Sequence, residues 1–214
     1  MIDHSRNESE TQASARTPRQ EEILDRALEL VQERGLANLT LKKVAERVGF
    51  TEPAIYRHFA HKEALVFALV DRLRDLVLGP IERIAKDSSL PPRARLERMV
   101  RHHVEVLRRT QGLPFLLIAE GIASGDDALL ARLRGNMADY ERLLVAVLAE
   151  AGLPAKPPLA QQAMQFIGLP AILGVLLRAN PDRALSNAEV DDLVSHYVRC
   201  LTTPVSSRRK TARR

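Results

Sequence analysis

Apolar residues recur three or four positions apart along most of this 214-residue chain, the spacing that gives a helix one buried face. Alternating runs of β-branched residues, which are typical of strands, do not occur. The pattern predicts an all-α protein, with a kink or break where Gly79 and Pro80 interrupt one helix. The expected helices span residues 18–34, 41–48, 51–59, 61–79, 93–109, 114–123, 126–151, 158–179 and 186–201.

The length suits one or two small domains, and two helical domains fit the pattern best. We expect an N-terminal three-helix domain at residues 18–66 and a larger helical domain at residues 67–204. Residues 1–17 are polar and predict a disordered leader. Residues 205–214 form a basic tail that we also expect to be disordered.

Two short helical patterns meet at a turn between Thr40 and Leu65. The first ends at Gly49, which suits a left-handed residue after a helix. Thr51 can then cap a second helix with its hydroxyl, and Pro53 falls in the first turn, where a missing N–H does no harm. The apolar face of the first helix consists of Leu41, Val44, Ala45 and Val48. This arrangement predicts a helix-turn-helix.

The outward side of the second helix carries groups that hydrogen-bond to bases or phosphates: Glu52, Tyr56, Arg57 and His58. Lys62 falls in the first turn of the following helix, where the helix dipole favours an anion. A bound phosphate would neutralise this lysine. Taken one at a time, Tyr56 and His58 are better explained as partly buried packing residues, so the interpretation depends on the whole set.

The pattern T-x-x-x-V-A-x-x-V-G-F-T-x-x-A-I-Y-x-H-F-x-x-K-x-x-L closely resembles the DNA-binding domain of the tetracycline-repressor (TetR) family. The resemblance covers roughly residues 18–66, with Phe50 and Pro53 as mild departures. It implies phosphate contacts from Thr40, Thr51, Tyr56, His58 and Lys62. It places Lys42, Glu52, Pro53, Ala54 and Arg57 where base edges are read.

The positive net charge of the chain is weaker evidence for DNA binding than its value first suggests. The net charge of +5 equals the contribution of the tail residues Arg208, Arg209, Lys210, Arg213 and Arg214. Residues 16–62 hold nine basic and seven acidic side chains, so the placement of charge matters more than its sum. The tail is either a solvated end or a nonspecific phosphate-binding arm.

Several classes of protein are disfavoured. The leader lacks the apolar core of a signal peptide, and no stretch of about 18 uninterrupted apolar residues occurs, so we expect a cytoplasmic protein. The single cysteine, Cys200, excludes an intramolecular disulfide and is expected to be buried. We expect no cofactor and no metal site.

A helical enzyme is the rival interpretation, with His102, His103, Glu105 and Glu120 as its candidates. Adjacent histidines point about 100° apart on a helix, and no H-x-x-x-H pair, phosphate loop or G-x-S-x-G elbow occurs. A surface ion pair between His102 and Glu105 is the ordinary explanation. We therefore expect that the chain is not an enzyme.

The larger domain is expected to hold an effector pocket and a dimer interface. Each pocket candidate is equally explained as core: Phe67, His103, Val104, Leu107, Phe115, Ile118, Glu120, Met137, Tyr140, Met164 and Phe166. The last two helices suit a four-helix dimer interface, which TetR-like proteins build from these helices, or an intramolecular hairpin. The interface candidates are Gly168, Ala171, Gly174, Val190, Leu193, Val194, Tyr197, Val198 and Leu201.

The sequence thus predicts a homodimeric transcriptional regulator, a repressor that a small molecule releases from a palindromic operator. The alternative is a TetR-like DNA-binding protein that acts through a protein partner instead of a ligand.

Overall fold

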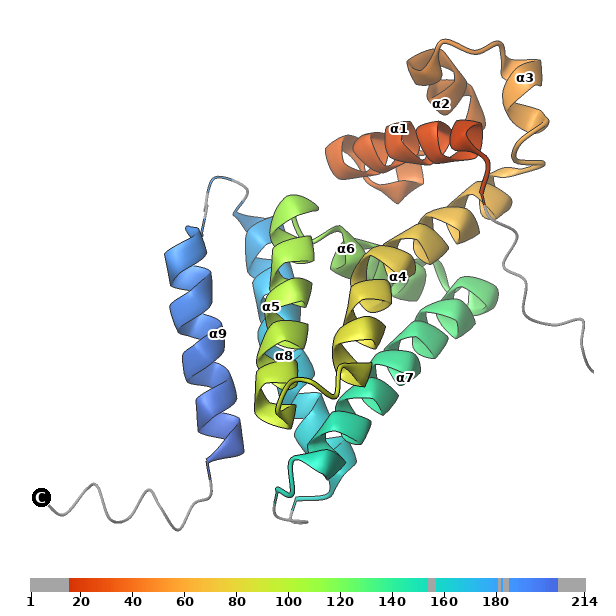
Figure 1. The fold of residues 1–214 in the computed structure, drawn as a ribbon. Coiled ribbons are helices and arrows are strands. Elements are labelled where there is room, and N and C mark those ends of the chain that lie inside the picture. Colours follow the sequence, from red (N-terminus) through yellow and green to blue (C-terminus); the bar gives the residue numbers. More distant parts are fainter. Residues whose placement is uncertain (1–15, 154–156, 181, 183–184, 204–214) are drawn as a thin grey trace, which may run out of the picture. The chain divides into compact units, whose positions relative to one another are not determined.

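The computed structural model describes residues 16–153, 157–180, 182 and 185–203. Within these ranges the chain forms nine α-helices, one 3₁₀ helix and no strand, which confirms the all-α prediction (Figure 1). Residues 1–15 and the basic tail lie outside the described residues. The chain divides into two compact units, residues 1–66 and 67–214, and each is described by itself below.

The first unit contains α1 (Pro18–Arg34), η1 (Leu36–Asn38), α2 (Leu41–Val48) and α3 (Glu52–Tyr56). Thr17 is the N-cap of α1 and accepts a hydrogen bond from the amide of Gln20. It therefore belongs to the helix start and not to a disordered leader. The apolar stripes of α1 and α2 are buried as their spacing predicts, with Leu24, Val31 and Val44 fully inaccessible.

Polar contacts fix α2 against α1 at the edge of this small core. The Arg47 guanidinium on α2 donates to Glu33 on α1 at 2.7 Å and lies 3.5 Å from Glu29. The hydrogen bond from Arg47 lowers the pKa of Glu33. This pair keeps α2, and the turn that follows it, in a defined orientation on α1.

The second unit is a bundle built around α5 and α8 (Figure 1). Helix α5 packs against α7, α8 and α9, and α8 also packs against α6, α7 and α9. Its core cluster draws on α4, α5, α7, α8 and α9 and includes Leu96, Val147 and Phe166. Its helices are the part of α4 (Lys62–Lys86) from residue 67 onward, α5 (Pro92–Arg109), α6 (Leu113–Ser124), α7 (Asp127–Glu150), α8 (Leu159–Ala179) and α9 (Asn187–Thr202).

Helix α4 continues through Gly79 and Pro80 to Lys86, so of the expected kink or break the break does not occur. A proline inside a helix leaves the carbonyl four residues earlier without its usual donor. That carbonyl belongs to Leu76, and Nε2 of His102 on α5 lies 2.9 Å from it. Because a carbonyl only accepts, Nε2 carries the proton, and His102 supplies the donor that Pro80 lacks.

Helix α8 is apolar nearly all round because several helices cover it. Within the described residues it is the one helix long and apolar enough to cross a membrane by length and composition, a test that core helices of soluble proteins also pass. Leu169, Leu173 and Leu177 are buried among neighbouring helices. Its place in the bundle therefore explains the apolar residues on its covered side, whereas Ile172 and Val175 are each 53% exposed.

Candidate DNA-binding surface and ligand cavity

The turn between α2 and α3 has the local geometry that the sequence predicts, with one exception. Gly49 takes the left-handed conformation at φ 78°, and Pro53 lies in the first turn of α3. The Thr40 hydroxyl caps α2 by accepting from the amide of Lys43 at 3.2 Å. Thr51 occupies the N-cap position of α3, but its side chain makes no capping hydrogen bond, so the predicted capping role is wrong.

Most of the predicted DNA-contacting side chains are exposed together around this turn. Ala54, His58 and Lys62 are half-buried. Ile55 and Phe59, which alternate with the exposed residues, are buried and attach α3 to the unit. The exposed residues are Thr40, Lys42, Thr51, Glu52, Pro53, Tyr56 and Arg57.

Phe50 joins the turn to α1, a contact that the sequence alone did not reveal. Its ring stacks on His58 with centroids 6.1 Å apart, and the Arg19 guanidinium lies 4.0 Å from its centre. A guanidinium over an aromatic face is attractive. His58 therefore has a packing role beside the phosphate contact that the resemblance implies.

A cavity of about 110 Å³ lies within the second unit, between α4, α5, α6, α7 and α8. His103 and Tyr140 reach it from α5 and α7, and their rings meet edge to face with centroids 5.2 Å apart. Phe115 of α6 stacks on His103 at 6.4 Å. The remaining wall is mostly aliphatic, so the cavity suits an apolar molecule.

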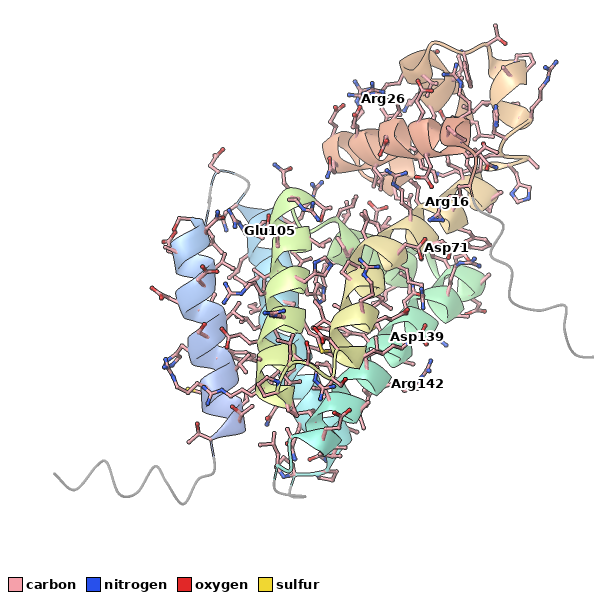
Figure 2. All side chains as sticks on the ribbon, viewed as in Figure 1. Arg16, Arg26, Asp71, Glu105, Asp139 and Arg142 are labelled. Carbon is pink, nitrogen blue, oxygen red and sulfur yellow. The ribbon has the colours of Figure 1, made fainter. Side chains whose placement is uncertain are left out.

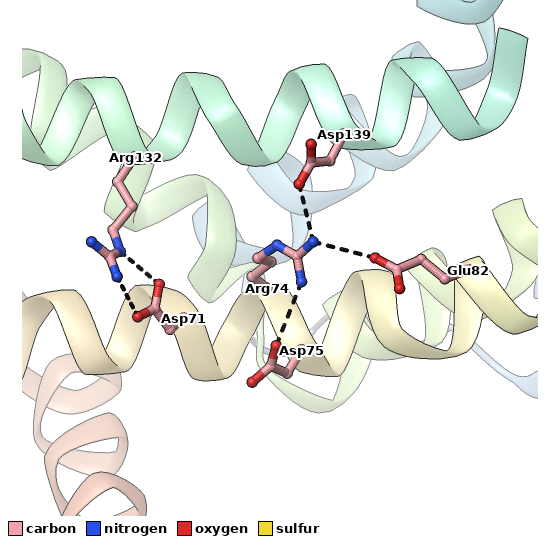
Figure 3. A network of polar contacts seen from close by, with 6 residues as sticks. All are labelled: Asp71, Arg74, Asp75, Glu82, Arg132 and Asp139. Carbon is pink, nitrogen blue, oxygen red and sulfur yellow. Dashed lines mark hydrogen bonds and ion pairs between the residues drawn. The ribbon is translucent and has the colours of Figure 1, made fainter. Parts of the chain in front are cut away.

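Charged side chains join α4 to α7 (Figure 3), among them Asp71 and Asp139, which are also labelled in Figure 2. Arg132 donates twice to Asp71, both at 2.6 Å. Arg74, which borders the cavity, lies 3.0 Å from Asp139, 3.2 Å from Glu82 and 3.6 Å from Asp75. The positive charge of Arg74 is therefore surrounded by carboxylates.

A family model described as bacterial regulatory proteins of the tetR family matches residues 23–69, which include α2, α3 and the start of α4. The nucleoid occlusion factor SlmA of Escherichia coli strain K12 is 30% identical over 142 residues, which are 66% of this chain and 71% of SlmA. The chain belongs to the TetR family. It is a DNA-binding transcription regulator, which agrees with the expectation that it is not an enzyme.

Solved structures share the fold of this TetR-family chain over most of its length. The regulator FadR from Bacillus subtilis, in complex with stearoyl-CoA, superposes with a TM-score of 0.71 at 15% identity, covering 86% of this chain and 97% of FadR. The regulator AibR, in complex with isovaleryl coenzyme A and operator DNA, superposes with a TM-score of 0.68 at 23% identity. That match covers 87% of this chain and 99% of AibR.

Five of the eleven predicted pocket residues line the cavity of this TetR-family chain: His103, Phe115, Ile118, Met137 and Tyr140. The other six do not. Val104, Leu107 and Phe166 are buried in the core, because their helices present them to other neighbours. Met164 is 69% exposed on α8, Phe67 lies under Arg132, and Glu120 is half-buried away from the lining.

The remaining histidine and cysteine candidates have structural explanations. Glu105 pairs with Arg108 at 3.0 Å, and His102 contacts the Leu76 carbonyl, so the expected His102–Glu105 pair does not form. Cys200 is half-buried, with Sγ 3.4 Å from Nε2 of His196, and is less buried than expected. Among the described residues, no cluster of three or more His, Cys, Asp or Glu side chains has the arrangement of a metal site.

The surface expected to form a dimer interface is only partly available. Gly174 is buried, and a side-chain carbon there would overlap the ring of Phe115 in the same chain. Val190, Val194 and Val198 of α9 are likewise buried in the chain's own core. These four assignments are therefore wrong, because α5 and α6 already cover those faces.

Helix α8 also carries an exposed apolar stripe. Met164, Ile172 and Val175 are 69%, 53% and 53% exposed, and Gly168 and Ala171 lie on the same side of the helix. A spacing of three residues drifts by about 60° per step around a helix, which turns Gly174 away from Gly168. Leu193, Tyr197 and Leu201 on α9 are only partly buried.

Replacing Lys62 with alanine should weaken binding to all DNA sequences similarly and reduce the salt dependence of binding by about one counterion. The reason is that Lys62 is the first residue of α4, where the free helix amides and the ammonium group would both attract a DNA phosphate. Fluorescence anisotropy measures the DNA affinity at salt concentrations between about 50 and about 200 mM. Losing one phosphate contact should reduce the slope of log affinity against log salt concentration by about one. An unchanged slope would remove Lys62 from the phosphate-binding set.

Proposed function

We propose that this chain is a homodimeric, cytoplasmic transcriptional repressor that binds a palindromic operator and is released by a small-molecule effector. The observation that carries the proposal is that one continuous helix, α4, begins with Lys62 of the DNA-binding set and lines the cavity with Leu73 and Val77. A molecule entering the cavity therefore contacts the helix that carries a DNA contact.

The similarity to AibR and FadR supports an effector. Those two structures hold isovaleryl coenzyme A and stearoyl-CoA, and the first also holds operator DNA. The second unit of this chain contains a mostly apolar cavity with a polar corner, formed by His103 and Tyr140. Mapping the DNA bound by the protein across its genome tests the proposal, because the genes beside the operator indicate both regulon and ligand.

Glu52 is proposed to contribute to base choice. It is exposed at the start of α3, and a carboxylate in a major groove accepts from the amino group of cytosine. Replacing Glu52 with alanine should relax one symmetric position in each half-site, by about 1–3 kcal/mol for a direct contact. Selection of sites from random DNA should then differ from wild type. Identical logos would contradict this role, and Lys62→Ala, which should keep the wild-type logo, is the matched control.

The exposed stripe on α8 is proposed to form the dimer interface with the same stripe of a second copy. Replacing Ile172 and Val175 with arginine should give a folded monomer, because two charges would then face an apolar partner. Sedimentation measures the assembly at micromolar concentration. The control is Ile122→Arg on α6, since Ile122 is 66% exposed but lies on another helix. A wild-type monomer, or an unaltered dimer in the double variant, would contradict the interface.

A second candidate is a DNA-bound regulator that acts through a protein partner. The similarity to SlmA, a nucleoid occlusion factor, favours this alternative. The two functions differ in their response to ligand. A cavity-binding molecule that leaves operator affinity unchanged would favour the protein-partner function over the effector-released repressor.

A further inference from the structure

Two buried polar groups on residues that line the cavity, the imidazole of His103 and the hydroxyl of Tyr140, indicate what kind of molecule it holds. Within the described part of the chain, neither Nδ1 of His103 nor the hydroxyl of Tyr140 has a hydrogen-bond partner. Their side chains are among the most buried polar ones, at 6% and 4% exposed. Leaving a buried donor or acceptor without a hydrogen-bond partner destabilises the folded protein. A bound molecule that satisfies these groups would remove that destabilisation.

Both groups are uncharged at neutral pH. Burial, aided by the neighbouring His102, lowers the pKa of His103 to about 3. Burial likewise raises the pKa of Tyr140 above its usual value. Tyr140 therefore offers a phenolic O–H that can donate, and His103 offers an uncharged imidazole. A hydroxyl on a ligand both donates and accepts, so it suits Nδ1 of His103 in either tautomer.

A charged ligand finds no unpaired opposite charge at the cavity. Arg74 is the charged residue among those described that border it, and Asp139, Glu82 and Asp75 surround its guanidinium. A ligand carboxylate that approached Arg74 would be repelled by these three acids. It would also lose its hydration without gaining an unpaired cation as a partner. Burying an unpaired charge is far more costly than burying a neutral hydroxyl.

The size of the cavity limits the ligand to about one ring. Its volume is about 110 Å³, while an engineered apolar cavity of about 150 Å³ in another protein binds benzene. Met137 borders the cavity and is 50% exposed, so its flexible side chain can move to admit a slightly larger molecule. A long acyl chain does not fit this volume.

We infer that the cavity binds a small, uncharged, mostly apolar molecule of about one ring that carries a single hydroxyl, with the oxygen placed between Tyr140 and His103. This inference rests on the proposed function for its regulatory consequence, since it names the class of effector. Binding itself does not require DNA. The two can therefore be tested separately.

Four compounds that share one ring distinguish the possibilities: benzyl alcohol, toluene, benzoate and benzylamine. Titration calorimetry on the full-length protein at pH 7 measures each affinity without DNA. Benzyl alcohol should bind tightest. Tyr140→Phe keeps the ring and removes the hydroxyl, so it should weaken benzyl alcohol by about twofold to tenfold and leave toluene unchanged. Thermal unfolding confirms that the variant folds.

The matched control is Tyr197→Phe, since the Tyr197 hydroxyl donates to the Gln165 carbonyl and does not border the cavity. It should change the binding of neither compound. Tighter binding of benzoate or benzylamine, equal binding of toluene and benzyl alcohol, or an unaffected Tyr140→Phe would overturn the inference. The absence of any binding at millimolar concentration would also overturn the inference. Water, and not a ligand, would then be the hydrogen-bond partner of His103 and Tyr140.

Operator affinity measured with and without benzyl alcohol separates this inference from the proposed function. If benzyl alcohol binds and operator affinity does not change, the ligand class stands and the effector role fails. If a charged compound releases the operator through this cavity, the effector role stands and the inferred ligand class is wrong.

Discussion

A molecule that fills the cavity should lower operator affinity about a hundredfold in the wild-type protein and much less in a Pro80→Ala variant. A hundredfold change requires that the ligand bind the released conformation of the proposed dimer more tightly than the DNA-binding conformation, by about 2.7 kcal/mol. The recognition helices of a dimer enter successive major grooves about 34–36 Å apart, so a small pivot of α4 disturbs both half-sites together.

Pro80 is the proposed pivot because α4 lacks one helical hydrogen bond there. The Leu76 carbonyl accepts from His102 instead, so the position is held by a side chain of α5 and not by the helix itself. Alanine restores the missing N–H and should stiffen the helix. Operator affinity without ligand should stay within severalfold of wild type, while the ligand's effect on it falls.

The measurement is a titration of operator binding with and without ligand in both proteins. His102→Ala is the informative companion, since it removes the donor but keeps the proline. This variant should loosen the pivot and should not reproduce the effect of Pro80→Ala. If the ligand acts equally on wild type and Pro80→Ala, Pro80 is not the pivot. If it binds without any effect on wild type, the coupling itself fails.

Replacing Gly174 with alanine should destabilise the second unit by about 1–3 kcal/mol, the usual cost of forcing an extra carbon into a packed core. The new methyl group would overlap the ring of Phe115, which is also a wall of the cavity. Phe115 therefore has to move, and ligand binding should weaken along with stability. Denaturant unfolding, followed by calorimetry with benzyl alcohol, measures the two effects.

Gly135 provides the control for this prediction. It lies inside α7, and a side-chain carbon there would meet nothing within 4 Å. Because glycine is a poor helix former, Gly135→Ala should stabilise the protein by up to about 1 kcal/mol. A Gly174→Ala protein as stable as wild type would show that α6 and α8 do not pack as tightly as described.

Local patterns in the sequence were sufficient to predict the helices and the helix-turn-helix. The stripe of α1, the left-handed Gly49 and the position of Pro53 follow from contacts within one or two turns, which residue spacing encodes directly. The exposed set from Lys42 to Arg57 follows from the same periodicity, together with the family resemblance. The capping role of Thr51 failed because an N-cap position does not by itself orient the hydroxyl.

The tertiary structure alone decided which neighbour covers each apolar face. Periodicity shows that Gly174 and Val194 lie on apolar faces, but the identity of the covering helix depends on residues far away in the chain. The same reason explains why Tyr140 lines the cavity while Phe166 belongs to the core. It also explains why α4 continues through Pro80, since the compensating donor, His102, comes from another helix.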